Sequence, residues 1–141
     1  MIIAISGTPG TGKTTVAKLL AKKLKWEYVA INDLVFKKKL YLNFDESRQS
    51  FDVNLEKLGK EVERLRKSKD NIVLEGHLSH YFPVDMVFVL RCRPDVLKKR
   101  LEKKYSWPTK IYENVEAERF GVITEEALER NEKVYEIDTT D

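Results

Sequence analysis

The residues that most constrain the fold are the nine from Gly7 to Thr15, "GTPGTGKTT", which directly follow the apolar run "MIIAIS". Glycine, proline and threonine at this density suit neither a helix nor a strand. The preceding run is short and rich in β-branched residues, which predicts a buried parallel strand. From Thr14 to Leu24, apolar residues recur at helical spacing with lysines on the other face. The chain therefore opens with a strand, a glycine-rich turn and a helix.

The spacing Gly7-x-x-x-x-Gly12-Lys13-Thr14 is that of a phosphate-binding loop. In such a loop, successive backbone N–H groups surround the phosphates of a nucleotide, and glycines permit the turn and the close approach. We expect Lys13 to reach the β- and γ-phosphates, the Thr14 hydroxyl to hold Mg²⁺, and the start of the helix to stabilise the anion. The alternative is a glycine-rich turn without function, which the preceding strand and following helix make much rarer.

The rest of the chain alternates between strands and helices. Further strands are predicted at 26–31, 71–77, 85–91 and 133–139, and helices at 34–40, 55–67, 94–104 and 111–129. The segments 41–53 and 105–110 are expected to be irregular, with 41–53 either mobile or facing a ligand. This alternation predicts a doubly wound, five-stranded parallel sheet with helices on both faces, which binds ligands at the carboxyl ends of its strands. No helix follows the last strand, so either the chain is truncated there or that helix is dispensable.

Composition narrows the class of protein. A chain of 141 residues fits a single domain with a sizeable core, and its net charge of +3 is too small for a dedicated nucleic-acid binder. The single cysteine, Cys92, forbids an internal disulfide and suits a reducing cytosol. No run of residues is long and apolar enough to span a bilayer, and the start lacks a signal peptide. We expect a cytoplasmic protein, monomeric and without a membrane partner.

Two polar residues follow the strand predicted at 71–77. Glu75 ends the apolar run "NIVLE", beside the phosphates and their metal, so we expect it to hold Mg²⁺ through water. The alternative is an ordinary acid at a strand end. His77 lies at the same rim and could position or deprotonate an attacking water or hydroxyl. A structural loop histidine explains it equally well, and His80 is a weaker candidate.

A further pair of candidates lies on the helix predicted at 94–104. Arg100 and Lys104 are four residues apart, on one face of a helix that leads into "YSWPTK". Cations presented by a mobile segment neutralise the charge that develops in phosphoryl transfer. The alternative is a solvated basic helix face, which the sequence alone favours.

Several motifs together resemble one known family. "GTPGTGKTT" at the amino terminus, "VLEGHLSHYFP" with "VFVLR" close behind it, and "NVEAE" at 114–118 resemble the adenylate kinase isoenzyme 6 family, over nearly the whole chain. The resemblance implies a P-loop fold of the nucleoside monophosphate kinase type with a short lid. It also implies a small nucleoside monophosphate kinase with ATPase activity, which acts in maturation of the small ribosomal subunit and binds one of its proteins.

The resemblance also assigns residues to roles. It implies a monophosphate-binding region at about 30–53, a lid at about 103–113, and ATP with Mg²⁺ as the phosphoryl donor. The nucleotide-binding set is Gly10, Thr11, Gly12, Lys13, Thr14, Thr15 and Lys104, and the monophosphate-binding set is Asn32, Asp33, Lys37 and Arg48. Two positions depart from the family. Glu75-Gly76-His77 replaces its usual Asp-x-His, and Lys104-Tyr105-Ser106 replaces an arginine followed by Gly-Tyr.

Three functions remain open at this point. The first is transfer of the terminal phosphoryl group of ATP to a nucleoside monophosphate. The second is a nucleotide-switched assembly factor whose ATP hydrolysis releases a ribosomal protein, and the third is a small-metabolite kinase on the same fold. A GTPase is disfavoured, because the chain has no Asn-Lys-x-Asp motif for reading guanine.

Overall fold

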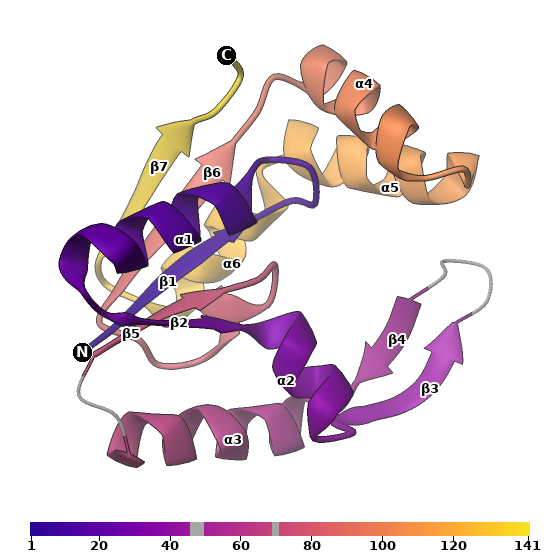
Figure 1. Ribbon diagram of the computed structural model, residues 1–141. Coiled ribbons are helices and arrows are strands. Elements are labelled where there is room, and N and C mark those ends of the chain that lie inside the picture. The colour runs from indigo at the N-terminus through magenta and orange to yellow at the C-terminus, as the bar shows by residue number, and fades with distance from the viewer. Residues whose placement is uncertain (46–49, 69–70) are drawn as a thin grey trace.

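A computed structural model describes residues 1–45, 50–68 and 71–141 of the chain. In this part, five parallel strands form the central sheet, in the order β2-β5-β1-β6-β7 (Figure 1). Their bounds are β1 Ile2–Gly7, β2 Glu27–Ala30, β5 Ile72–Glu75, β6 Met86–Arg91 and β7 Val134–Asp138. Every residue of β1 is buried, as expected for a central strand of a parallel sheet. The predicted five-stranded parallel sheet is confirmed.

Helices cover both faces of this sheet and make the predicted three layers (Figure 1). The helices are α1 Lys13–Leu24, α2 Ile31–Lys37, α3 Leu55–Ser68, α4 Pro94–Lys104, α5 Pro108–Arg119 and α6 Val122–Arg130. Ala17 and Ala21 of α1 pack on one face of the sheet, against Ile3 and Ile5. On the opposite face, α3 packs on Ile72 and Leu74, and α6 packs on Val87 and Val89.

The described parts of the segment 41–53, residues 41–45 and 50–53, are not irregular, and this prediction is wrong. They form the strands β3 Tyr41–Asp45 and β4 Ser50–Val53, which pair antiparallel in a separate two-stranded sheet. Each of these strands is short and lies outside the five-stranded sheet, so their sequence lacks the alternation of a strand with a buried face. The hairpin lies beside α2, at the edge of the molecule (Figure 1).

The single long helix predicted at 111–129 is also wrong. The chain turns at Gly121, whose φ of 65° is left-handed, and α5 and α6 are separate helices on either side of it. The glycine allows this turn without the strain that a side chain would cause. The first of the two helices begins earlier than predicted because Pro108 occupies its first turn, where a proline is favoured.

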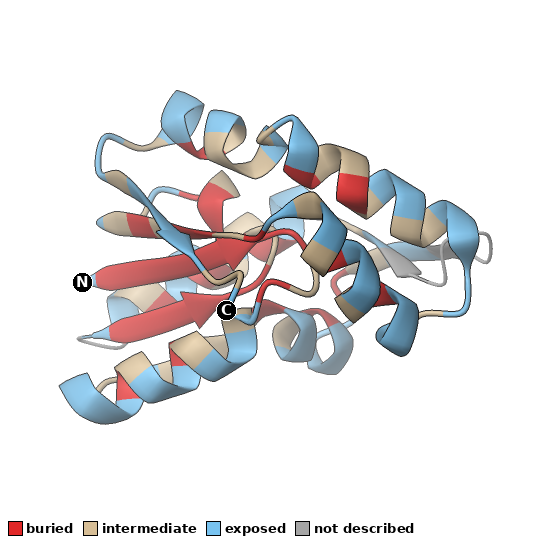
Figure 2. Ribbon diagram, turned by 90° about the horizontal axis from the view of Figure 1, so that it is seen from above, coloured by how far each residue is buried: buried red, intermediate tan, exposed pale blue. Residues whose placement is uncertain are grey.

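The topology brings the candidate site together at one end of the sheet. Gly7 ends β1 and Glu75 ends β5, and these two strands are neighbours in the sheet, with Ile5 opposite Glu75. The first helix begins at Lys13, directly after the glycine-rich loop. In Figure 2 the central strands are buried, while the outward surfaces of the helices are exposed. None of the described helices is both long and apolar enough to cross a membrane.

Candidate functional site

The glycine-rich loop requires glycine at specific positions. Gly7 has a φ of 147°, and a Cβ there would lie 2.8 Å from the Leu90 carbonyl oxygen and 2.8 Å from Thr11 Oγ1. Gly12 caps the start of α1 in a left-handed conformation with a φ of 93°. Since L-residues with side chains avoid this region, the loop conformation is fixed by its glycines. The loop thus leads directly from β1 into the first turn of α1.

Lys13 lies folded back over this loop. Its Nζ donates a hydrogen bond of 3.2 Å to the Thr8 carbonyl oxygen, which also accepts one of 2.7 Å from Thr11 Oγ1. Burial lowers the pKa of Lys13 to about 8, against the opposing effect of Glu75, and Lys104 lowers it further. A partly desolvated ammonium next to glycine-rich backbone is well suited to bind an anion.

Glu75 is buried beside the loop and accepts two hydrogen bonds. Its Oε1 lies 3.0 Å from Thr14 Oγ1 and 2.7 Å from the Tyr28 hydroxyl. Burial raises the pKa of Tyr28, and the hydrogen bond to Glu75 raises it further. The Thr14 hydroxyl and the Glu75 carboxylate are thus oxygen donors held together at the loop, a set that suits Mg²⁺.

No cluster of three or more His, Cys, Asp and Glu side chains that could hold a metal occurs among the described residues. The donors present are the Thr14 hydroxyl and the Glu75 carboxylate, and Mg²⁺ is commonly held by one or two carboxylates together with the phosphates of its nucleotide. The donor set therefore fits the ion.

The two histidines have different surroundings. His77 is partly buried and lines the cleft, and burial lowers its pKa to about 4, with the nearby Lys13 as the next cause. It is therefore neutral near pH 7. His80 is fully buried, with Nδ1 2.7 Å from Ser6 Oγ and Nε2 3.0 Å from Glu126 Oε1. His80 is therefore a core residue with a polar partner at each ring nitrogen, as expected of a buried polar side chain with a structural role.

Two lysines lie around one aromatic ring where α4 joins α5. Lys104 Nζ is 5.3 Å and Lys110 Nζ is 4.2 Å from the centroid of the Tyr105 ring, within the range of cation–π interactions. Burial lowers the pKa of Lys110, and Lys104 lowers it further. The ring therefore holds two cations at the cleft, of which sequence reasoning identified only Lys104.

The loop, Glu75, His77 and these lysines line one cleft of about 730 Å³. The predicted residues found in its lining are Gly10, Gly12, Lys13, Thr14, Thr15, Asn32, Glu75, His77 and Lys104. Eight further side chains of the lining had no individual role in the sequence analysis, although the predicted monophosphate-binding region and lid contain six of them. They are Pro9, Val35, Phe36, Val53, Tyr105, Lys110, Glu113 and Asn114. One signal was available in the sequence, because Lys110 lies within the predicted lid at about 103–113 and Asn114 directly follows it.

Other predicted residues do not line the cleft. Arg100 lies behind the loop, where its guanidinium donates to the carbonyl oxygens of Gly10 at 3.4 Å and of Thr139 at 2.6 Å. Thr11 is buried and hydrogen-bonds within the loop. Asp33 and Lys37 are exposed on α2 and are not among the lining residues. Arg48 lies outside the described residues.

Comparisons with known proteins show which family the chain belongs to. A model of the AAA domain family matches residues 3–121 of the chain. A protein of Methanocaldococcus jannaschii, named "Putative adenylate kinase", is 44% identical over 140 residues, which cover 99% of this chain and 77% of that protein. The chain belongs to this archaeal family. A second family member of the same name, from Thermococcus gammatolerans, is 48% identical over 141 residues, with 99% of this chain and 77% of the relative covered.

Solved structures place the family member in the P-loop kinase fold. A gluconokinase from Sinorhizobium meliloti aligns with a TM-score of 0.57 at 13% identity, covering 99% of this chain and 82% of that one. A shikimate kinase from Bacteroides thetaiotaomicron aligns with a TM-score of 0.58 at 19% identity, covering 92% and 79%. At these identities the likeness concerns the fold alone.

Proposed function

We propose that the chain is a nucleoside monophosphate kinase that transfers the terminal phosphoryl group of ATP to AMP or a similar monophosphate, with intrinsic ATPase activity. The observation that carries this proposal is the single cleft that joins Lys13, the Thr14–Glu75 pair and the lysines at Tyr105. Phosphoryl transfer needs positioning and neutralisation of charge more than covalent chemistry, and these are the groups that supply both. The name of the archaeal relatives supports the same reaction.

The phosphate end of the cleft is assigned to ATP. The loop backbone would surround the phosphates, with Lys13 on the β- and γ-phosphates, and Thr14 and Glu75 would hold Mg²⁺, the glutamate through water. When bound, the ion neutralises charge on the phosphates. Lys104 and Lys110 would add charge from the lid, at about 103–113 of the single domain. Arg100 would act from behind the loop, because it hydrogen-bonds the Gly10 carbonyl rather than facing the cleft.

The other end of the cleft is assigned to the monophosphate. Asn32, Val35 and Phe36 of α2 and Val53 of β4 line it, and they belong to the proposed monophosphate-binding region at about 30–53. An amide with apolar neighbours suits a nucleobase, which offers hydrogen-bonding edges and apolar faces. Asp33, Lys37 and Arg48 remain proposed contacts of the acceptor, from the same region.

The reaction itself tests the proposal. ADP is expected to form from ATP and AMP at least about tenfold faster than from ATP alone, since a bound monophosphate presents a positioned acceptor oxygen in place of water. The measurement is ADP release with AMP, CMP, GMP and UMP in turn. Equal rates with and without every monophosphate would contradict the kinase and favour the ATPase switch.

His77 separates the two reactions further. Because burial lowers the pKa of His77 to about 4, its imidazole is neutral near pH 7. A neutral imidazole can orient the attacking oxygen or accept a proton from it. If hydrolysis without acceptor equals the rate with AMP, and His77→Ala removes it, the switch is favoured. If His77→Ala lowers transfer to AMP as well as hydrolysis, the same imidazole serves both acceptors.

The affinity for ATP is expected to fall as the pH rises above 8. Burial lowers the pKa of Lys13 to about 8 in the free protein, while bound phosphates favour the charged ammonium and raise that pKa. Binding then takes up a proton, so the dissociation constant should rise by up to about tenfold per pH unit above 8. Titration calorimetry between pH 7 and 9.5 measures this. Lys13→Arg, which stays protonated, should show a flatter profile, and identical profiles would contradict the assignment.

A cellular role is proposed from the resemblance to the isoenzyme 6 family. The chain would act in the cytoplasm, as a monomer, in maturation of the small ribosomal subunit, through one of its proteins. Pull-down of small-subunit proteins with and without ATP tests this role. Absence of any nucleotide-sensitive partner would contradict it.

A further inference from the structure

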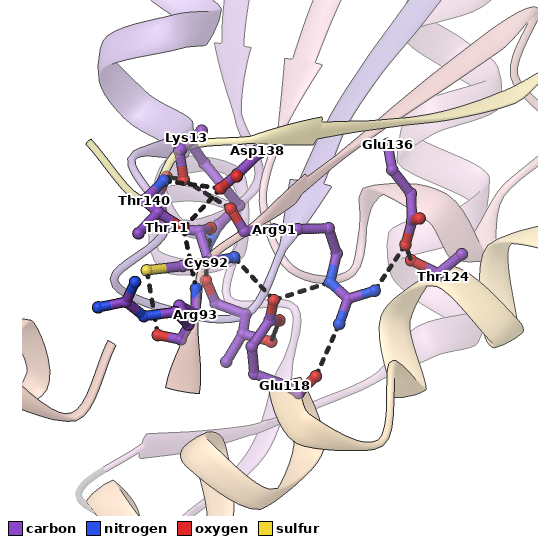
Figure 3. A network of polar contacts seen from close by, with 12 residues as sticks. Thr11, Lys13, Arg91, Cys92, Arg93, Glu118, Thr124, Glu136, Asp138 and Thr140 are labelled. Atoms are coloured by element: carbon purple, nitrogen blue, oxygen red, sulfur yellow. Dashed lines mark hydrogen bonds and ion pairs between the residues drawn. The ribbon is translucent and has the colours of Figure 1, made fainter. Parts of the chain in front are cut away.

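Glu118 is a buried carboxylate with three donors from different parts of the fold. Only 2% of this residue is exposed. Its Oε1 accepts from Thr8 Oγ1 at 2.8 Å, and its Oε2 accepts from Arg91 Nε at 2.7 Å and from the Cys92 amide at 2.9 Å. Figure 3 shows the last two contacts converging on the carboxylate from the end of β6. A buried charge paired in this way is costly to disturb, because any partner removed leaves it uncompensated.

The first of these donors connects Glu118 to the catalytic lysine of the proposed reaction. The Thr8 hydroxyl donates a hydrogen bond to Glu118, while the Thr8 carbonyl oxygen accepts a hydrogen bond of 3.2 Å from Lys13 Nζ. The same carbonyl is held by Thr11 Oγ1 at 2.7 Å. Thr8 is therefore hydrogen-bonded both to Glu118, through its hydroxyl, and to Lys13, through its carbonyl oxygen.

Glu118 also lies on the helix that supplies the lid side of the cleft. Lys110 and Asn114 line the cleft and precede Glu118 on α5 at steps of four residues, so all three share one helix face. Asn114 Nδ2 donates to the Lys110 carbonyl oxygen at 2.8 Å. One end of this face thus meets the cleft, and the other is hydrogen-bonded to the phosphate loop.

Arg91 ties the same carboxylate to the last strand. Its Nη2 donates to the Glu118 carbonyl oxygen at 2.8 Å, and its Nη1 pairs with Glu136 of β7 at 2.6 Å (Figure 3). Glu136 in turn accepts from Thr124 Oγ1 of α6 at 2.7 Å. The outer pair is half-exposed, so it contributes less than the buried contacts of Glu118.

We propose that Glu118 is a positioning residue, which couples the phosphate loop to helix α5 and so fixes Lys13 relative to Lys110. This proposal rests on the proposed phosphoryl transfer. Glu118 touches neither nucleotide nor metal in it; it acts through Thr8 on one side and through α5 on the other. Small errors in placing charged groups around a reacting phosphoryl lower the rate of the chemical step, while substrate affinity changes less.

Thr8→Val is the central variant, because it keeps the shape of the side chain and removes only the hydroxyl that Glu118 holds. We expect kcat for ATP and AMP to fall about tenfold, with KM for both changed less than threefold. Thr8→Ser, which restores the hydroxyl, should recover most of kcat. Glu136→Gln is the control, since it removes the charge of the outer Arg91 pair, leaves the contacts of Glu118 intact and should leave kcat within twofold.

A double-mutant cycle measures the coupling itself. Lys110→Ala and Thr8→Val together should lower kcat by clearly less than the product of their separate fold-changes. The fold-changes of Lys110→Ala and Glu136→Gln should multiply when the two are combined. Thermal unfolding of each variant identifies any that fail to fold. The proposal is overturned if the fold-changes in kcat of Lys110→Ala and Thr8→Val also multiply, or if Thr8→Val lowers only Tm and keeps the wild-type kcat.

Failure of the proposed function would be visible separately. If wild-type protein shows no acceleration by AMP, the kinase assignment fails. The same cycle is then measured on kcat for ATP hydrolysis without acceptor, where the absence of coupling between Thr8 and Lys110 would overturn the role of Glu118 on its own.

Discussion

Lys13→Ala is expected to lower kcat for phosphoryl transfer by about 10³-fold, the largest effect of any single substitution proposed for this chain. Its ammonium lies at the loop beneath the cleft, with Nζ 3.2 Å from the Thr8 carbonyl oxygen, and it is the cation assigned to the transferred phosphoryl group. Alanine removes that charge, and no other lysine takes its place in the loop. A coupled assay for ADP with ATP and AMP measures the loss.

The fold should survive this change. Burial lowers the pKa of Lys13 to about 8, which means that the charged ammonium carries a desolvation cost in the folded protein at pH 7. Alanine removes this cost, so Tm should not fall. Lys22→Ala on the exposed side of the same helix is the matched control and should keep both activity and Tm. Activity of Lys13→Ala near that of Lys22→Ala would contradict the assignment of the loop.

The centre of the sheet was predictable because β1 and β5 are buried along their whole length and β6 along half of it. Continuous apolar runs such as that of β1 arise only where helices cover both faces, and the alternation with helices fixes parallel pairing. The hairpin of β3 and β4 was not predictable in the same way, because those strands pair only with each other. The break between α5 and α6 depends on the left-handed φ of Gly121, although a glycine within an apolar period is the one signal for such a break.

The phosphate side of the site follows from local sequence, since loop, strand end and helix start are contiguous or lie on neighbouring strands. The lid side depends on contacts between distant segments. Lys110 reaches the cleft because α5 begins at Pro108, and Thr8 meets Glu118 across 110 residues of chain. Helical spacing made Arg100 a candidate cation, with a solvated basic face as the alternative. That spacing defines a helix face and not its neighbour, and the Arg100 guanidinium donates to the Gly10 carbonyl oxygen of the loop.

Glu75→Gln is expected to lower kcat by about 10²-fold at a fixed, moderate Mg²⁺ concentration and to raise the Mg²⁺ concentration needed for half-maximal rate. Glutamine has the length of glutamate, and its Oε1 can still accept from Thr14 Oγ1 and the Tyr28 hydroxyl. The substitution therefore removes the charge and keeps the hydrogen bonds. Initial rates across a Mg²⁺ titration measure both effects.

Tyr28→Phe is the complementary variant, because it removes one of those hydrogen bonds and keeps the carboxylate charge. Its loss should cost about 1 kcal/mol of stability, seen as a lower Tm, and leave the Mg²⁺ titration near that of the wild type. If Glu75 acted only as a hydrogen-bond acceptor at the strand end, the order of the two effects on kcat would reverse. Tyr28→Phe would then lower kcat more, and Glu75→Gln would leave it nearly unchanged. The displacement of the Mg²⁺ midpoint in Glu75→Gln alone is thus what distinguishes a metal-holding carboxylate from a structural one.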